Sequence, residues 1–98
     1  MKIEINHNLS QSQALIRVQE VIRKAKSNYA SHINYFDESW IENKGKVKIH
    51  SYGFKITGVL TITEKNILIN LKLPLATYLY KNQIKSSIIN ELNTKLTL

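Results

Sequence analysis

The fold is decided by the stretch of residues 44–62, which reads KGKVKIHSYGFKITGVLTI. Apolar residues recur at every second position in each half of this stretch, which is the period of a β-strand with one buried face. The pair Tyr52-Gly53 separates the halves and is typical of a tight turn. The stretch therefore predicts a hairpin in which Val47, Ile49 and Leu60 face one core.

The same period of two continues on both sides of this hairpin. Residues 35–42 predict a preceding strand with Phe36 and Trp40 on one face, and Asn43-Lys44-Gly45 is a hairpin turn signal. Residues 67–73 predict a following strand, and residues 3–5 predict a short strand at the start of the chain. Successive hairpins favour an antiparallel sheet.

Two segments instead show the period of 3.6 that is typical of amphipathic helices, and we expect helices over about 10–31 and 75–96. Ser10 and Gln13 have the spacing of a capping box, and Pro74 suits a first helical turn. The second apolar stripe, with Leu79 and Ile89 beside it, contains Tyr80, Ile84, Ile88, Leu92 and Leu96. The expected fold is α+β, in the order β-α-β-β-β-β-α, with four to five antiparallel strands and both helices on one face.

Composition limits the organisation and the chemistry. The 98 residues suffice for a single domain, 1–98, and the absence of cysteine excludes disulfides and thiolate chemistry. The first residues lack the apolar run of a signal peptide, and no stretch approaches the length of a membrane span, so we expect a cytoplasmic protein. Residues 1–43 carry five basic and five acidic side chains, whereas residues 44–98 carry nine lysines against two glutamates, which accounts for the net charge of +7.

The residues do not form the patterns that common catalytic sites need. The three histidines lack the spacing of a zinc site, and Asp37 and Glu38 point to opposite faces of a strand. No serine lies in a Gly-x-Ser-x-Gly motif, and the glycines are too scattered for a phosphate loop. We therefore expect no enzymatic activity, cofactor or metal. His7 shares the parity of Ile3 and Ile5, which leaves open a structural role at the strand–helix junction or a functional one.

The outward face of the sheet is the predicted interaction surface. Strand parity aligns Lys46, Lys48 and His50, and it adds two more lysines and two aliphatic residues, Lys55, Lys72, Val59 and Leu68. The aliphatic positions favour self-association or contact with a hydrophobic surface. The lysines favour nucleic acid or the ribosome, although the outward positions of the middle strands lack stacking aromatics.

The chain resembles the polyhydroxyalkanoic acid system, or granule-region, family of small bacterial proteins over nearly its whole length. The residues that carry the resemblance are 5–10 (INHNLS), Ala14, Arg17, Trp40, 58–62 (GVLTI), 71–73 (LKL), Lys81, Ile84 and Ile88. The resemblance implies a granule-associated or polymer-metabolism accessory role and no catalytic residues. It also implies the granule surface or granule proteins as partners. The outward face of the sheet adds a homodimer as a further expectation, with nucleic acid or ribosome binding as the alternative.

Overall fold

A five-stranded antiparallel sheet forms one layer of the protein. The computed structural model describes residues 1–96 and contains the strands β1 (Lys2–Asn6), β2 (Tyr35–Ile41), β3 (Lys44–Ser51), β4 (Phe54–Ile62) and β5 (Asn66–Lys72). They lie in the order β1-β5-β4-β3-β2, so the first strand pairs with the last. Every neighbouring pair is antiparallel, which confirms the predicted sheet and fixes its size at five strands.

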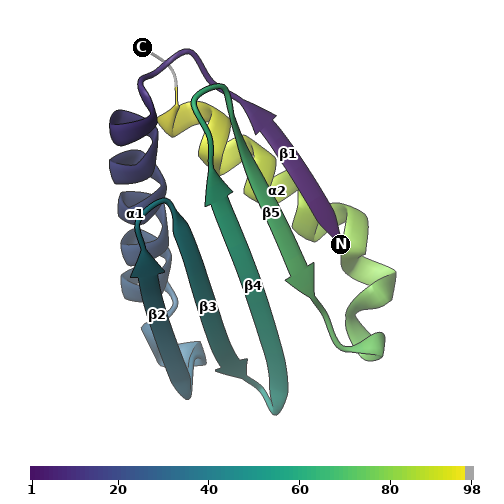
Figure 1. Ribbon diagram of the computed structural model, residues 1–98. Coiled ribbons are helices and arrows are strands. Elements are labelled where there is room, and N and C mark those ends of the chain that lie inside the picture. Colours follow the sequence, from purple (N-terminus) through teal and green to yellow (C-terminus); the bar gives the residue numbers. More distant parts are fainter. Residues whose placement is uncertain (97–98) are drawn as a thin grey trace.

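Two helices form the second layer and cover the same face of the sheet (Figure 1). Helix α1 (Gln11–Asn28) is followed by the short 3-10 turn η1 (Ala30–His32), and helix α2 (Lys81–Lys95) is preceded by the 3-10 segment η2 (Leu75–Tyr80). The predicted capping box starts α1: the Gln13 backbone N–H donates to Ser10 Oγ at 3.1 Å, and the Ser10 N–H donates to Gln13 Oε1 at 3.2 Å. The predicted α+β order is therefore confirmed.

The core lies between the two layers, where the inward residues of the strands meet the apolar stripes of the helices. Its largest fully buried members are Ile62, Ile67 and Val18, and it also contains Ile3, Ile5, Leu9, Ala14, Val47, Leu60, Ile69, Leu92 and Leu96. Strand parity predicted the inward positions, because successive side chains of a strand point to opposite faces.

The two helices converge at one end of the sheet and diverge at the other (Figure 1). At the converging end, Arg17 Nη1 donates to the Lys95 carbonyl oxygen at 3.2 Å, which ties α1 to the last turn of α2. Toward the C-terminal end of α1 the helices separate, and the sheet between them has less helical cover. This divergence creates the groove described below.

Two local expectations differ from the structure. The turn after β2 is formed by Glu42 and Asn43, and Gly45 pairs with Trp40 inside the hairpin instead of forming the turn. Glu42 occupies the left-handed region at φ 54°. Gly45 is needed for a different reason: a Cβ there would lie 2.7 Å from the Trp40 ring, which packs directly over this glycine.

The second difference concerns the segment after Pro74. Its first six residues form η2, and the α-helix begins only at Lys81. The apolar stripe expected over 75–96 is therefore buried only in its C-terminal half, through Leu92 and Leu96. Leu79 and Tyr80 are exposed, because the 3-10 backbone does not continue the α-helical stripe onto the sheet.

The contact between Gly45 and Trp40 gives a stability prediction. Gly45→Ala should lower the free energy of unfolding by about 1–3 kcal/mol, because the indole must leave its position. The Trp40 Nε1–H donates to Glu38 Oε2 at 2.7 Å, and this bond would be strained by the same movement. Urea denaturation measures the change.

The matched control is the double-mutant cycle with Trp40→Leu. In that background Gly45→Ala should cost much less, because the ring that meets the new methyl group is gone. An equal cost in both backgrounds would contradict the proposed packing.

Candidate binding groove

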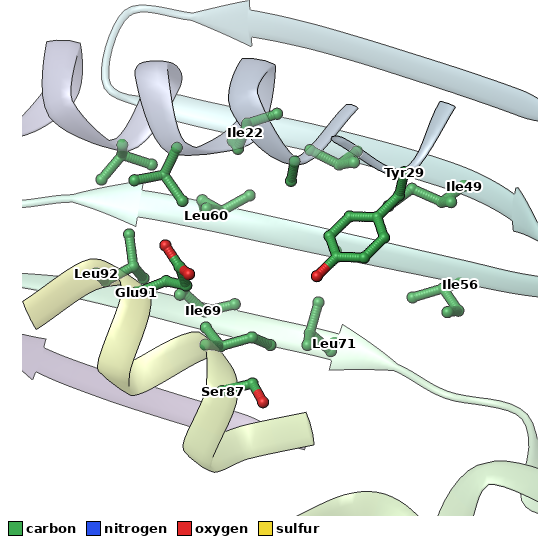
Figure 2. Close-up of a pocket in the computed structure, with 16 residues that line it drawn as sticks. Ile22, Tyr29, Ile49, Ile56, Leu60, Ile69, Leu71, Ser87, Glu91 and Leu92 are labelled. Carbon is green, nitrogen blue, oxygen red and sulfur yellow. The ribbon is translucent and has the colours of Figure 1, made fainter. Parts of the chain in front are cut away.

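An apolar groove of about 300 Å³ lies between the two helices and the sheet (Figure 2). Its floor consists of inward residues of the three central strands, among them Ile49, Ile56 and Leu71. Ile49 and Ile56 are paired across β3 and β4 and are only partly buried, although they point to the core side of the sheet. Apolar side chains that remain partly exposed to solvent inside a groove are available for contact with a ligand.

A buried glycine, Gly58, belongs to the lining of the groove. Gly58 lies on the inward side of β4, opposite Leu71 of β5 and Val47 of β3. A Cβ at this position would meet Leu71 Cδ2 at 2.8 Å, so any larger residue would displace that side chain or fill the groove. Glycine weakens a strand, and a common reason for its presence is the close approach of another group.

The groove has a small set of polar groups at its sides. Glu91 and Ser87 lie one turn apart on the same side of α2, and Tyr29 ends α1 on the opposite wall. Figure 2 shows the Glu91 carboxylate directed between the helices, Ser87 at the rim, and the Tyr29 ring reaching from α1 across the floor. An apolar cleft with a few polar groups is the usual composition of a small-molecule site.

The predicted interaction residues all lie on the other face of the sheet, opposite to the face that α1 and α2 cover (Figure 1). Lys46, Lys48 and His50 alternate along β3, and the register places Lys55 opposite His50. Thr57 of β4 pairs with Lys48 on one side and with Lys72 of β5 on the other, so the two lysines lie in one row across the sheet. Val59 lies on β4 and Leu68 on β5. We call this surface the outer sheet face. Its apolar members are Val59, which is partly buried, Leu68, which is 42% exposed, and Ile41 at the end of β2, which is 81% exposed.

The sequence analysis missed one aromatic residue on the outer sheet face. Tyr35 of β2 pairs with His50 of β3, and their ring centroids are 4.9 Å apart. Tyr35 is roughly half exposed and belongs to the edge strand, which is why the middle strands gave no sign of it. Strand parity applied to β2 would have found it.

His7 lies buried at the junction between β1 and α1, with 7% of its surface exposed. Its Nε2 lies 3.0 Å from the Thr63 carbonyl oxygen, and its backbone N–H donates to the Lys65 carbonyl at 2.9 Å. A carbonyl only accepts, so Nε2 carries a proton and donates it to the Thr63 oxygen. Nδ1 has no hydrogen-bond partner among the described residues. These contacts join the first strand to the β4–β5 turn.

A second feature missed by the sequence analysis is the cluster of exposed apolar side chains in η2. We call it the η2 patch, and it consists of Leu75, Tyr78, Leu79 and Tyr80. Leu75 is 81% exposed and Leu79 is 91% exposed. The Lys81 Nζ lies 5.8 Å from the centre of the Tyr78 ring, so a positive charge borders the patch. One feature of the sequence could have indicated this patch: Leu75 and Leu79 lie off the apolar stripe of the helix that follows.

Fold and groove together define a small helix-on-sheet domain of the α+β class. The family model described as "Putative polyhydroxyalkanoic acid system protein" matches residues 1–96, and the chain belongs to that family. Neither the curated proteins nor the solved structures contain a significant match. Within residues 1–96, no helix has the length and hydropathy to cross a membrane, and no three histidine or acidic side chains gather as metal ligands would.

The His7 contact gives a second stability prediction. His7→Leu should lower the free energy of unfolding by about 1–3 kcal/mol, because the Thr63 carbonyl loses its donor in a partly buried position. His7→Gln keeps an N–H donor of similar reach and should cost less. Thermal and urea denaturation of both variants test this, and a His7→Leu protein as stable as the parent would rule out the structural role.

Proposed function

We propose that the protein is a non-enzymatic accessory of polyhydroxyalkanoate metabolism that docks reversibly on the hydrophobic surface of the polymer granule. Membership of the polyhydroxyalkanoic acid system family supports the polymer context. The single observation that carries the docking is the η2 patch, where two leucines stand almost fully exposed beside two tyrosines. The proposal includes the cytoplasmic location that the sequence led us to expect.

The composition of the η2 patch suits a boundary between apolar polymer and water. Burying a leucine side chain contributes about 1.5–3 kcal/mol, so Leu75 and Leu79 together supply modest, reversible affinity. Tyrosines place an apolar ring on one side and a hydroxyl on the other, as Tyr78 and Tyr80 would at such a boundary. Lysines such as Lys81 extend their stems along the apolar surface and keep the ammonium group in water.

The polar groups of the groove support a binding role over a catalytic one. Among the residues that line it, Ser87 is accompanied by Glu91 and Tyr29 but by no histidine or lysine. An activated serine needs an adjacent general base within hydrogen-bond reach. The side chains of this site therefore suit recognition of a ligand better than bond cleavage.

Granule docking is tested by co-sedimentation with polyhydroxyalkanoate particles. Leu75→Asp combined with Leu79→Asp should lower the bound fraction about 10-fold or more, because each new carboxylate would have to be desolvated at the apolar surface. Ile41→Asp is the matched control: Ile41 is 81% exposed, as is Leu75, but lies at the end of β2. Equal loss in the control, or no loss in the double variant, would contradict docking through the η2 patch.

Nucleic-acid binding is a second candidate, favoured by the Tyr35–His50 ring pair on the lysine-bearing outer sheet face. If it operates, Lys46→Glu with Lys48→Glu should abolish binding to a mixed RNA pool. The parent's affinity should fall by roughly 0.7–0.9 log units per log unit of salt for each phosphate contact. If the face instead mediates self-association, Val59→Asp or Leu68→Asp should dissociate the assembly in sedimentation, with little effect of salt.

The control for the lysine variants is Lys24→Glu with Lys65→Glu, which changes the net charge equally at exposed positions outside the outer sheet face. Binding lost in both pairs would reflect overall charge alone. Binding lost only in the Lys46 and Lys48 variant would assign nucleic acid to the outer sheet face. We expect the parent protein to bind RNA weakly, because the central positions of this face carry Thr57, Val59 and Thr61 instead of stacking aromatics.

A further inference from the structure

We propose that the groove between α1 and α2 binds a single medium-length aliphatic chain that carries a hydroxyl group and no charge, such as a 3-hydroxyacyl ester unit. This inference rests on the proposed function for the polymer context, but it concerns a different site from the η2 patch. It names the ligand class from the size of the groove, its lining and the position of its one charged group.

Size limits the ligand to a small molecule. The volume of about 300 Å³ lies at the lower end of ligand pockets. At about 30 Å³ per heavy atom, taken from the volume of a water molecule in the liquid, it holds on the order of ten heavy atoms. A 3-hydroxyacyl ester with a chain of about eight carbons and three oxygens is of that order, whereas a partner helix is about 10 Å across and would need a much larger groove.

The lining favours an aliphatic chain. Isoleucine, leucine and valine side chains from both helices and the three central strands surround the floor, and the Leu71 side chain packs where Gly58 lacks a Cβ. Burial of methylene groups against such a surface is favourable by about 0.8 kcal/mol each. The aliphatic walls offer no flat aromatic pair that would select a planar ring, since Tyr29 is the one aromatic residue of the lining.

Charge selects a neutral ligand with a hydrogen-bond donor. Glu91 is the one ionisable acid or base among the lining residues apart from the Tyr29 phenol, and its carboxylate points between the helices (Figure 2). Glu91 is exposed, so solvent screens part of its charge. Its carboxylate still only accepts hydrogen bonds, so it favours a hydroxyl on the ligand and disfavours the anion of a fatty acid. The net charge of +7 disfavours a cationic ligand. A neutral hydroxylated chain satisfies both conditions.

The binding test compares three ligands of equal chain length by isothermal titration with the full chain. Methyl 3-hydroxyoctanoate should bind most tightly, and methyl octanoate should bind roughly 10-fold more weakly, because it cannot donate to Glu91. The 3-hydroxyoctanoate anion should also bind more weakly than its ester. Glu91→Gln should reduce the discrimination against the anion. Equal affinity for all three ligands, or binding of none of them, would overturn the proposal.

A matched pair of variants locates the ligand. Ser87→Phe places a large ring at the rim of the groove and should abolish binding, whereas Ser86→Phe makes the same change at an exposed neighbour outside the lining. Loss in both variants, or in neither, would overturn the assignment. Concentration-dependent self-association that only Ser87→Phe removes would assign the groove to a second copy of the chain and would also overturn it.

The two proposals fail separately. A protein that sediments with granules but does not bind the ester retains the proposed function and loses this inference. A protein that binds the ester through Ser87 and Glu91 but does not sediment with granules retains the groove assignment and loses granule docking. Because Leu75→Asp with Leu79→Asp changes neither Ser87 nor Glu91, it should leave ester affinity within about 2-fold of the parent protein, in line with additivity at separate sites.

Discussion

The structure depends on one packing constraint: two helices must bury the apolar face of a five-stranded sheet. They succeed where they converge, and Ile62, Ile67 and Val18 are completely enclosed there. Where they diverge, Ile49, Ile56 and Leu71 remain only partly covered. The cost of that exposed apolar surface is a reason to expect a ligand, because interiors of small domains are otherwise closely packed. The enclosed core and the open groove are thus opposite ends of the same interface between helices and sheet.

Much of the fold followed from the sequence because its signals are local. Alternation along residues 44–62 depends on the two-residue period of a strand, and the capping box at Ser10 and Gln13 depends on three positions of the chain. The first expected turn was misplaced, because Gly45 was interpreted as a turn residue. The glycine at position 45 is explained by the Trp40 ring on the neighbouring strand. This is a tertiary contact, which no local sequence pattern contains.

The candidate site was harder to predict, and the reason is geometric. Parity placed Lys46, Lys48 and the other predicted residues on one face, as the register shows, but it says nothing about whether that face binds anything. The groove depends on the angle between α1 and α2. That angle results from the tertiary packing of the two helices, which includes the hydrogen bond from Arg17 to the Lys95 carbonyl. The η2 patch depends on where a 3-10 segment gives way to an α-helix, and a periodic stripe does not reveal that boundary.

We propose that the space between α1 and α2 is an open site that an aliphatic ligand can occupy. Methyl-labelled NMR during addition of methyl 3-hydroxyoctanoate tests it most directly, because methyl groups report on both faces of the sheet at once. We expect shifts for the methyl groups of Ile49, Ile56 and Ile88, which line the groove, and little change for Val59 and Leu68 on the outer sheet face. Shifts confined to Val59 and Leu68, or to neither face, would contradict it.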